Sequence, residues 1–165
     1  MRGCLIALCL IGLASEAHSQ NREQGWGLSF HRDTFDGTVF PLAIVSESEK
    51  DFGATNVGVA CGKDGTLVPF ASEPFHFMIT GPLNYSFKSE TSTINVSFTA
   101  ESVPNLGKLM ALSGEPAKAF LDLFSASEQS VAYRTDTAQG KFPTIAAARV
   151  FDLMRSNCPQ PTTGG

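Results

Sequence analysis

The stretch TINVSFT at residues 93–99 has the most regular pattern in the chain, because apolar and polar side chains alternate along it. Ile94, Val96 and Phe98 share one face, and the Thr, Asn and Ser residues around them share the other. Successive side chains of a strand point to opposite sides of a sheet. A strand with one apolar and one polar face is typical of an antiparallel sheet that packs on one side and meets water on the other. This stretch therefore predicts an antiparallel sheet.

Further strands are expected on the N-terminal side of this stretch. Short alternating or apolar runs between turn residues predict strands at 26–30, 38–45, 56–61, 66–70, 75–79 and 84–88. Trp26, Leu28 and Phe30 share the face of the first strand that is expected to pack. Pro41 in the second strand suggests an edge position or a bulge, because proline has no N–H for the ladder.

The pattern changes to a helical period in the last third of the chain. Apolar residues at 117, 120, 121 and 124 predict a helix over 115–125, with Ser113 or Gly114 as its cap. A strand is expected at 130–134. A second helix, capped by Thr144, is expected to run to about Asn157 before Pro159.

The first nineteen residues read as a secretory signal peptide. Arg2 precedes an apolar run of about 11 residues, and small residues lead up to Ser19. A membrane crossing needs roughly 20 apolar residues, so no transmembrane anchor is expected after cleavage near Ser19. The sequence thus predicts a periplasmic or secreted protein.

Two cysteines, Cys61 and Cys158, remain beyond this leader. Cys61 ends the alternation of Val57 and Val59, and Cys158 ends a helical series of apolar residues at 147, 150, 151 and 154, so both thiols are expected to point inward. Thiol pairs oxidise in the compartments that exported proteins enter. The sequence therefore predicts a structural Cys61–Cys158 disulfide.

Together these patterns predict an α+β, mainly β fold: an antiparallel sheet or sandwich with two C-terminal helices, the last linked to the sheet by the disulfide. We expect a signal peptide at 1–19, a single exported domain at 20–158 and a flexible tail at 159–165. The domain is long enough to bury a core of its own.

Charge argues against a nucleic-acid partner. The chain has 12 Lys and Arg against 16 Asp and Glu, a formal net charge of -4, and the two signs are mixed throughout. Proteins that bind nucleic acid usually carry a basic patch or stripe. The densest charge near a turn lies in Tyr133–Asp136 and Gly140–Lys141, where a solvated hairpin and a binding patch are both open interpretations.

Residues with reactive side chains are few. His31, Asp33 and His76 are the candidates for a metal or hydrolytic site, but a zinc site takes three or four protein ligands. No nucleophile elbow, phosphate-binding loop or paired Cys-x-x-Cys is present in the sequence, so no catalytic residue and no cofactor are expected. Asn84 and Asn95 each fit the N-glycosylation pattern, which matters only in a eukaryotic secretory pathway.

The arrangement of these features resembles that of small periplasmic proteins of Gram-negative bacteria. The matching positions are Trp26, Cys61, Cys158 and the segments 119–121, 130–134 and 140–142. The chain is similar in this pattern to the invasion-associated locus B group and, more loosely, to type VI secretion accessory proteins of the VasI kind. The resemblance implies a β-rich envelope protein without catalytic residues that acts in secretion or host interaction.

Three functions follow as hypotheses. The first is a non-enzymatic exported accessory or binding protein whose partner is another protein. The second is a secreted hydrolase or metal-dependent enzyme that uses His31, Asp33 and His76. The third is an inhibitor or a carrier of small apolar ligands, with a cavity lined by some of the 13 Phe residues.

Overall fold

A computed structural model describes residues 25–48, 54–73 and 81–159. The predicted leader, the predicted strand at 75–79 and residues 160–165 of the predicted tail lie outside these ranges. The strands are β1 (Gly27–Arg32), β2 (Val39–Ser46), β3 (Asn56–Cys61), β4 (Leu67–Ser72), β5 (Leu83–Lys88), β6 (Thr93–Val103), β7 (Gly107–Ala111), β8 (Ser130–Arg134) and β9 (Gln139–Pro143). The helices are α1 (Gly114–Ala126) and α2 (Ala147–Asn157). The prediction of a mainly β chain with two helices is confirmed.

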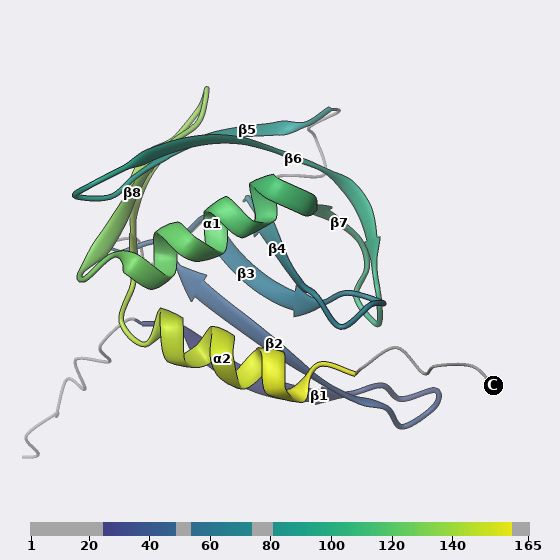
Figure 1. Cartoon of the computed structure of the whole chain (residues 1–165). Helices are drawn as coiled ribbons and strands as arrows, with labels where there is room; N and C mark the ends of the chain where they lie inside the picture. The colour runs from purple at the N-terminus through teal and green to yellow at the C-terminus, as the bar shows by residue number, and fades with distance from the viewer. Residues whose placement is uncertain (1–24, 49–53, 74–80, 160–165) are drawn as a thin grey trace, which may run out of the picture.

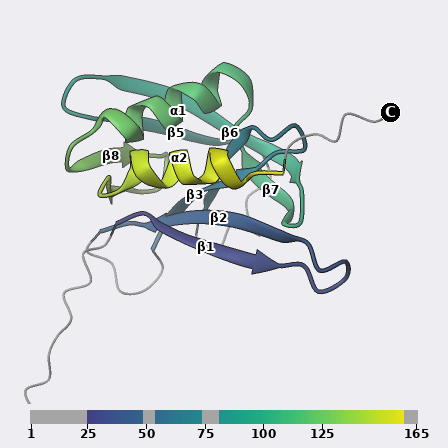
Figure 2. The ribbon, with the colours of Figure 1, turned by 60° about the horizontal axis from the view of Figure 1, so that its bottom comes forward.

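All nine strands belong to one antiparallel sheet, in the order β1-β2-β3-β4-β7-β6-β5-β8-β9. The sheet is strongly curved, and both helices lie on its concave side, with β5, β6 and β7 arching over α1 (Figures 1 and 2). Two backbone hydrogen bonds bring the ends of the sheet together. The N–H of Ser48 donates to the carbonyl of Lys141 at 2.8 Å, and that of Trp26 to Ile145 at 3.0 Å.

Aromatic rings fill the space between the sheet and the helices. The phenylalanines that are fully buried there are Phe87, Phe98, Phe120, Phe124, Phe142 and Phe151. The rings of Phe120 and Phe124 lie 4.4 Å apart, and Phe87 meets Phe120 edge to face at 5.4 Å. Rings offset or crossed in this way add to the free energy gained from burial. These rings pack against one another and line none of the surface hollows described below.

The last helix is held in the core by its apolar face and by the disulfide. Ala147, Val150, Phe151 and Met154 are buried, as their spacing predicts. Cys61 and Cys158 form the predicted disulfide, with their Cα atoms 5.4 Å apart and a sequence separation of 97. Both cysteines are buried. The disulfide therefore joins the end of β3 to the C-terminal end of α2.

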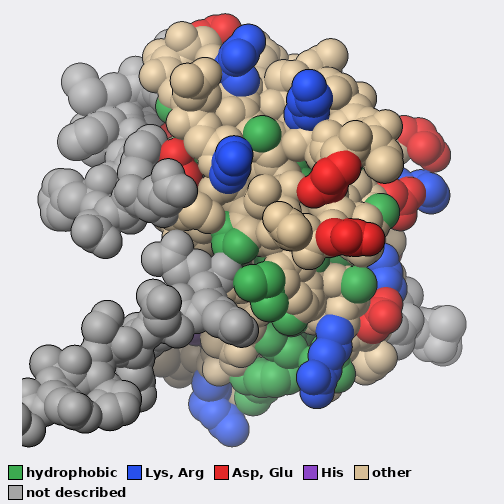
Figure 3. All heavy atoms as spheres, turned by 90° about the vertical axis from the view of Figure 1, so that its left-hand side faces the viewer, with side chains coloured by type: hydrophobic (Ala, Val, Ile, Leu, Met, Phe, Trp, Pro, Cys, Tyr) green, Lys and Arg blue, Asp and Glu red, His purple; other side chains and the backbone are tan. Residues whose placement is uncertain are grey.

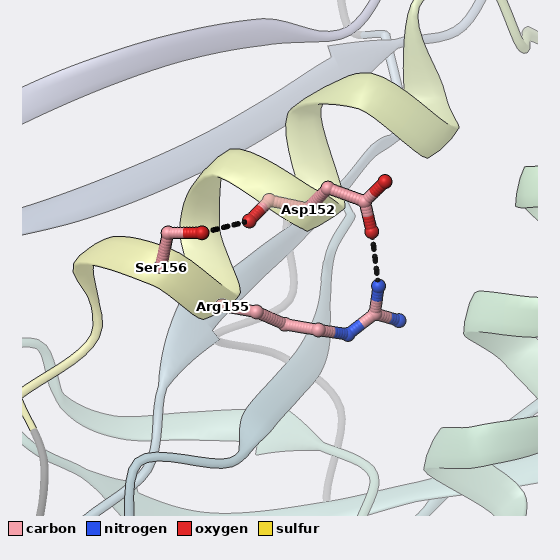
Figure 4. Close-up of polar contacts among 3 residues, drawn as sticks. All are labelled: Asp152, Arg155 and Ser156. Atoms are coloured by element: carbon pink, nitrogen blue, oxygen red, sulfur yellow. Dashed lines mark hydrogen bonds and ion pairs between the residues drawn. The ribbon is translucent and has the colours of Figure 1, made fainter.

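The opposite face of α2 is polar and meets water. Arg155 pairs with Asp152 at 2.7 Å, and the Ser156 hydroxyl donates to the carbonyl of Asp152 at 3.0 Å (Figure 4). Both charged side chains are more than half exposed, so this pair contributes little to stability. Within the described parts of the chain, neither helix has the length and apolar character needed to cross a membrane.

The predicted helix caps are partly wrong. Ser113 does precede α1, but its hydroxyl donates to Glu101 and accepts no hydrogen bond from a helix N–H. Thr144 does not cap α2: the residue before the helix is Ala146, in a left-handed conformation with φ of 64°. Thr144 instead follows directly after β9, and its N–H donates to the carbonyl of Gln129. The turn into α2 therefore comes two residues later than predicted.

The prediction that Trp26, Leu28 and Phe30 all pack is wrong for Phe30. Trp26 is buried, Leu28 is half-buried, and Phe30 is 56% exposed. Pro41 supplies the physical reason. Glu47, the residue directly after β2, donates its N–H to Thr55, so the backbone groups of the odd-numbered residues of β2, Pro41 included, face β3. Since proline has no N–H to donate, the β2–β3 ladder starts only at Ala43, and the part of β2 before it pairs with β1 alone.

Candidate functional site

His31 and Asp33, two residues of the predicted metal or hydrolytic site, lie near the tip of the β1–β2 hairpin. His31 is exposed, its Nε2 lies 2.9 Å from the Ser29 hydroxyl, and its ring stacks on Phe40 at 5.8 Å. Asp33 instead accepts a hydrogen bond from the N–H of Phe35 at 2.7 Å. His76 lies outside the described residues. Among those that are described, no three His, Cys, Asp or Glu side chains gather where a metal ion would fit.

The acidic residues of the hairpin tip hold the turn. Asp33 bonds through its backbone to Thr38 and Gly37, and the carboxylate of Asp36 accepts the N–H of Thr38 at 2.8 Å. The hydrogen bonds from Thr38 lower the pKa of Asp36 below its usual range. Gly37 adopts a φ of 78°, which a residue with a Cβ rarely does. The tip is therefore a defined turn that presents Phe35, which lies between its two aspartates, to solvent.

Apolar side chains are exposed along this hairpin. Phe35 is 99% exposed, Phe30 56% and Val39 46%. Single exposed apolar residues are normal on soluble proteins, but several on one projecting element mark surfaces that bind other molecules. Figure 2 shows the β1–β2 hairpin extending beyond the body of the molecule.

The backbone of β1 also offers an open edge. Asp33 donates its N–H to Thr38 of the same hairpin, which shows that the odd-numbered residues of β1 face β2. The N–H and C=O groups of Leu28, Phe30 and Arg32 therefore point the other way, and no backbone bond joins them to any described residue. The N–H of Trp26 points the same way, but it donates to the carbonyl of Ile145. Within residues 25–48, 54–73 and 81–159, the edge is thus closed at its start and open from Leu28 onward.

A second cluster lies where the sheet nearly closes on itself. The Tyr133 hydroxyl donates to Thr55 Oγ1 at 3.1 Å, and the N–H of Thr55 donates to Glu47 at 3.5 Å. Glu47 is only 2% exposed and packs on Gly140, where a Cβ atom would overlap its carboxylate. Burial, with smaller contributions from neighbours that include Glu47, raises the pKa of Tyr133 to about 12.

The other tyrosine, Tyr85, is held in the same way. Its hydroxyl donates to Glu73 Oε1 at 2.6 Å, and its ring lies 5.7 Å from that of Tyr133. Burial, together with the Glu73 carboxylate, raises the pKa of Tyr85 far above its ordinary value. Both tyrosines of the chain are therefore neutral hydrogen-bond donors at physiological pH.

This arrangement predicts a loss of stability in strong alkali. The unfolded chain releases the tyrosine proton near pH 10, while folded Tyr133 keeps it to about pH 12. A raised folded pKa stabilises the native state fully below pH 10, and that contribution falls as pH rises through this window. Chemical denaturation at pH values from 8 to 11.5 is expected to show a steeper decline in the native protein than in Tyr133→Phe. Parallel declines in the two proteins would contradict the assignment.

The predicted charge cluster at Tyr133–Asp136 and Gly140–Lys141 forms the β8–β9 hairpin. Arg134 and Lys141 lie on its outer face, and pairing of β5 with β8 brings Lys88 beside them. These three side chains line one open hollow of about 670 Å³. Lys88 could not be grouped with these residues from the sequence, because β6, β7 and α1 lie between it and Arg134 in the chain.

Comparisons of the chain with protein-family models, curated proteins and solved structures find no match. The resemblance to the invasion-associated locus B and VasI-type groups stays a prediction. The enzyme and ligand-carrier hypotheses also stay predictions. The two surfaces described above, the β1 edge and the β5–β8–β9 hollow, are the features from which a function can be argued.

Proposed function

We propose that this chain is a non-enzymatic exported binding protein, and that it holds an extended segment of a partner protein along the open edge of β1. The observation that carries the proposal is the set of unpaired backbone groups at Leu28, Phe30 and Arg32 beside the exposed rings of Phe30 and Phe35. Strand addition to a sheet edge uses main-chain hydrogen bonds for affinity and side-chain contacts for specificity.

Two further features support this use of the hairpin. Proteins usually protect a sheet edge with charged residues, bulges or a covering segment, because an open edge pairs with other chains. Among the described residues, Ile145 covers the start of β1, and the side chains that follow on this strand include the exposed Phe30. Before Ala43, β2 pairs with β1 alone, so this part of the hairpin projects from the rest of the sheet, with the open edge of β1 on its outer side.

The proposed site of action is the periplasm or the outside of the cell. The sequence predicts a signal peptide at 1–19, and the Cys61–Cys158 disulfide is compatible with an oxidising compartment. These observations support export together with the binding role.

Site-specific photocrosslinking tests the proposal. A photoreactive phenylalanine analogue in place of Phe35 is expected to form an adduct with a partner protein in an envelope extract of the source cells. The same analogue in place of Leu153, which is 42% exposed on α2, serves as the control for non-specific labelling. Identical adducts at both positions, or none at Phe35, would contradict the proposal.

A matched pair of substitutions at Arg32 tests the backbone contribution. Arg32→Pro removes the N–H that faces the open edge, whereas Arg32→Gln removes the charge but keeps the N–H. The proline variant is expected to reduce the Phe35 adduct by about tenfold, a reduction worth one to two hydrogen bonds. The glutamine variant is expected to retain it. Equal yields from the two variants would argue against strand addition.

A further inference from the structure

The hollow on the outer face of β5, β8 and β9 has a defined arrangement of side chains. Strand pairing aligns Lys88, Ala132 and Lys141 in one row across the sheet, and Arg134 lies in the next row between Ser86 and Gln139. Neighbouring strands are about 4.8 Å apart, so the two lysines flank Ala132 across roughly 10 Å. The short side chain of Ala132 leaves the centre of this row open. Three basic residues therefore surround a floor that no large side chain fills.

Charge in this hollow is not neutralised by the described residues. Among the described residues, the ion pairs are Lys118 with Asp122 on α1 and Arg155 with Asp152 on α2. None of these pairs involves Lys88, Arg134 or Lys141. Glu47 is the acidic residue among those that line the hollow, and its carboxylate is buried against Thr55 and Gly140. Three positive charges and one negative charge leave the lining with a net charge of +2. Figure 3 faces the β8 side of the molecule and shows separate Lys and Arg side chains in its upper half, with Asp and Glu side chains also present on this face.

From this geometry we infer a binding site for a small molecule that carries two or more phosphate- or carboxylate-type groups. The guanidinium of Arg134 can donate two parallel hydrogen bonds to one such group, and the lysines act as point charges on either side. The hydroxyls of Ser86 and Thr93 line the same hollow and can donate further hydrogen bonds. A volume of about 670 Å³ is within the range of small-molecule sites.

The spacing favours more than one anionic group on the ligand. Lys88, Arg134 and Lys141 form a triangle, and the backbones of the two lysines are roughly 10 Å apart. A single oxyanion is expected to sit at one corner of this triangle. A ligand with two or more groups can meet Arg134 and both lysines together. This site is separate from the β1 edge, and the inference does not depend on the proposed protein-binding function.

Isothermal titration calorimetry at low ionic strength tests the inference, with tripolyphosphate as the probe and inorganic phosphate and citrate for comparison. Tripolyphosphate is expected to bind at least tenfold more tightly than phosphate, and added salt is expected to weaken it. Affinity for citrate compared with tripolyphosphate tells whether carboxylates or phosphates are preferred.

Three variants locate the site. Arg134→Gln is expected to weaken tripolyphosphate binding about tenfold, since it removes charge-assisted hydrogen bonds. Ala132→Leu leaves every charge in place but fills the floor, and is expected to weaken binding by a similar factor. Lys118→Gln, which removes one positive charge on α1, is the matched control and is expected to bind as the native protein does.

Two outcomes would overturn the inference. One is the absence of tripolyphosphate binding at millimolar concentration in protein whose circular dichroism is native. The other is binding that does not depend on this hollow: native affinity in both Arg134→Gln and Ala132→Leu would place the anion elsewhere, and a loss in Lys118→Gln equal to that in Arg134→Gln would show a response to overall charge.

Discussion

Replacing Phe87 by Ala is expected to lower the free energy of unfolding by about 3–5 kcal/mol, the range for a large aromatic side chain removed from a close-packed core. The Phe87 ring has no exposed surface and contacts the rings of Phe98, Phe120 and Phe124 at centroid distances of 5.4 to 6.4 Å. Phe98 belongs to strand β6, whereas Phe120 and Phe124 belong to helix α1. The cavity left by the substitution therefore cannot close by a simple shift of one element.

Phe35→Ala is the matched control, because Phe35 is fully exposed at the hairpin tip. Its expected effect is within about 0.5 kcal/mol. Urea denaturation followed by circular dichroism measures both variants. A loss below about 1 kcal/mol for Phe87→Ala would mean that the ring cluster does not form the core described above.

Removing the disulfide is expected to have an effect of similar size. In the chain-entropy model a cross-link that closes a loop of 97 residues stabilises the native state by about 4–5 kcal/mol. The double variant Cys61→Ala/Cys158→Ala is expected to lose about that amount, measured by urea denaturation under oxidising conditions. Both cysteines are buried, so a small part of any loss comes from packing.

The reduced native protein separates the two contributions. It keeps both side chains and lacks only the S–S bond, so it is expected to lose most of the stability that the double variant loses. Equal stability of the oxidised and reduced proteins would show that the cross-link does not restrict the unfolded chain as the loop length implies.

Elements with strong local patterns were predicted correctly from the sequence. The alternation at 93–99 places Val96 and Phe98 in the core and the polar residues between them in solvent. The helical series that ends at Cys158 is buried along its length. In both cases one face is apolar and the period is regular, so local sequence and tertiary packing favour the same structure.

Two strands were missed because their sequences lack this regularity. Gly107–Ala111 (β7) begins with Gly and Lys and then becomes uniformly apolar, without alternation. Gln139–Pro143 (β9) contains Gly and Pro, which are usually turn residues. Both become strands through pairing with their neighbours, β6 and β8. Strand propensity depends on such neighbours more than on the residues themselves.

The surfaces proposed to bind were harder to predict than the core. The pattern at 26–30 gives no indication that Phe30 is exposed, because the reason lies in Pro41 on the next strand. Likewise, only the pairing of β5 with β8 reveals that Lys88 joins Arg134 and Lys141. Long-range pairing of strands cannot be read from composition or spacing.

The packing of Trp26 has a consequence for how the chain reaches its native state. Its indole ring lies edge to face 4.7 Å from Phe151, so one of the first described residues rests on the final helix. A ribosome makes the strands that precede α1 long before residues 147–158 exist, and until then the part of their apolar side that α2 covers lacks its partner. The native packing around Trp26 therefore has to wait until α2 has been made, and the apolar surface exposed meanwhile is of the kind that chaperones bind.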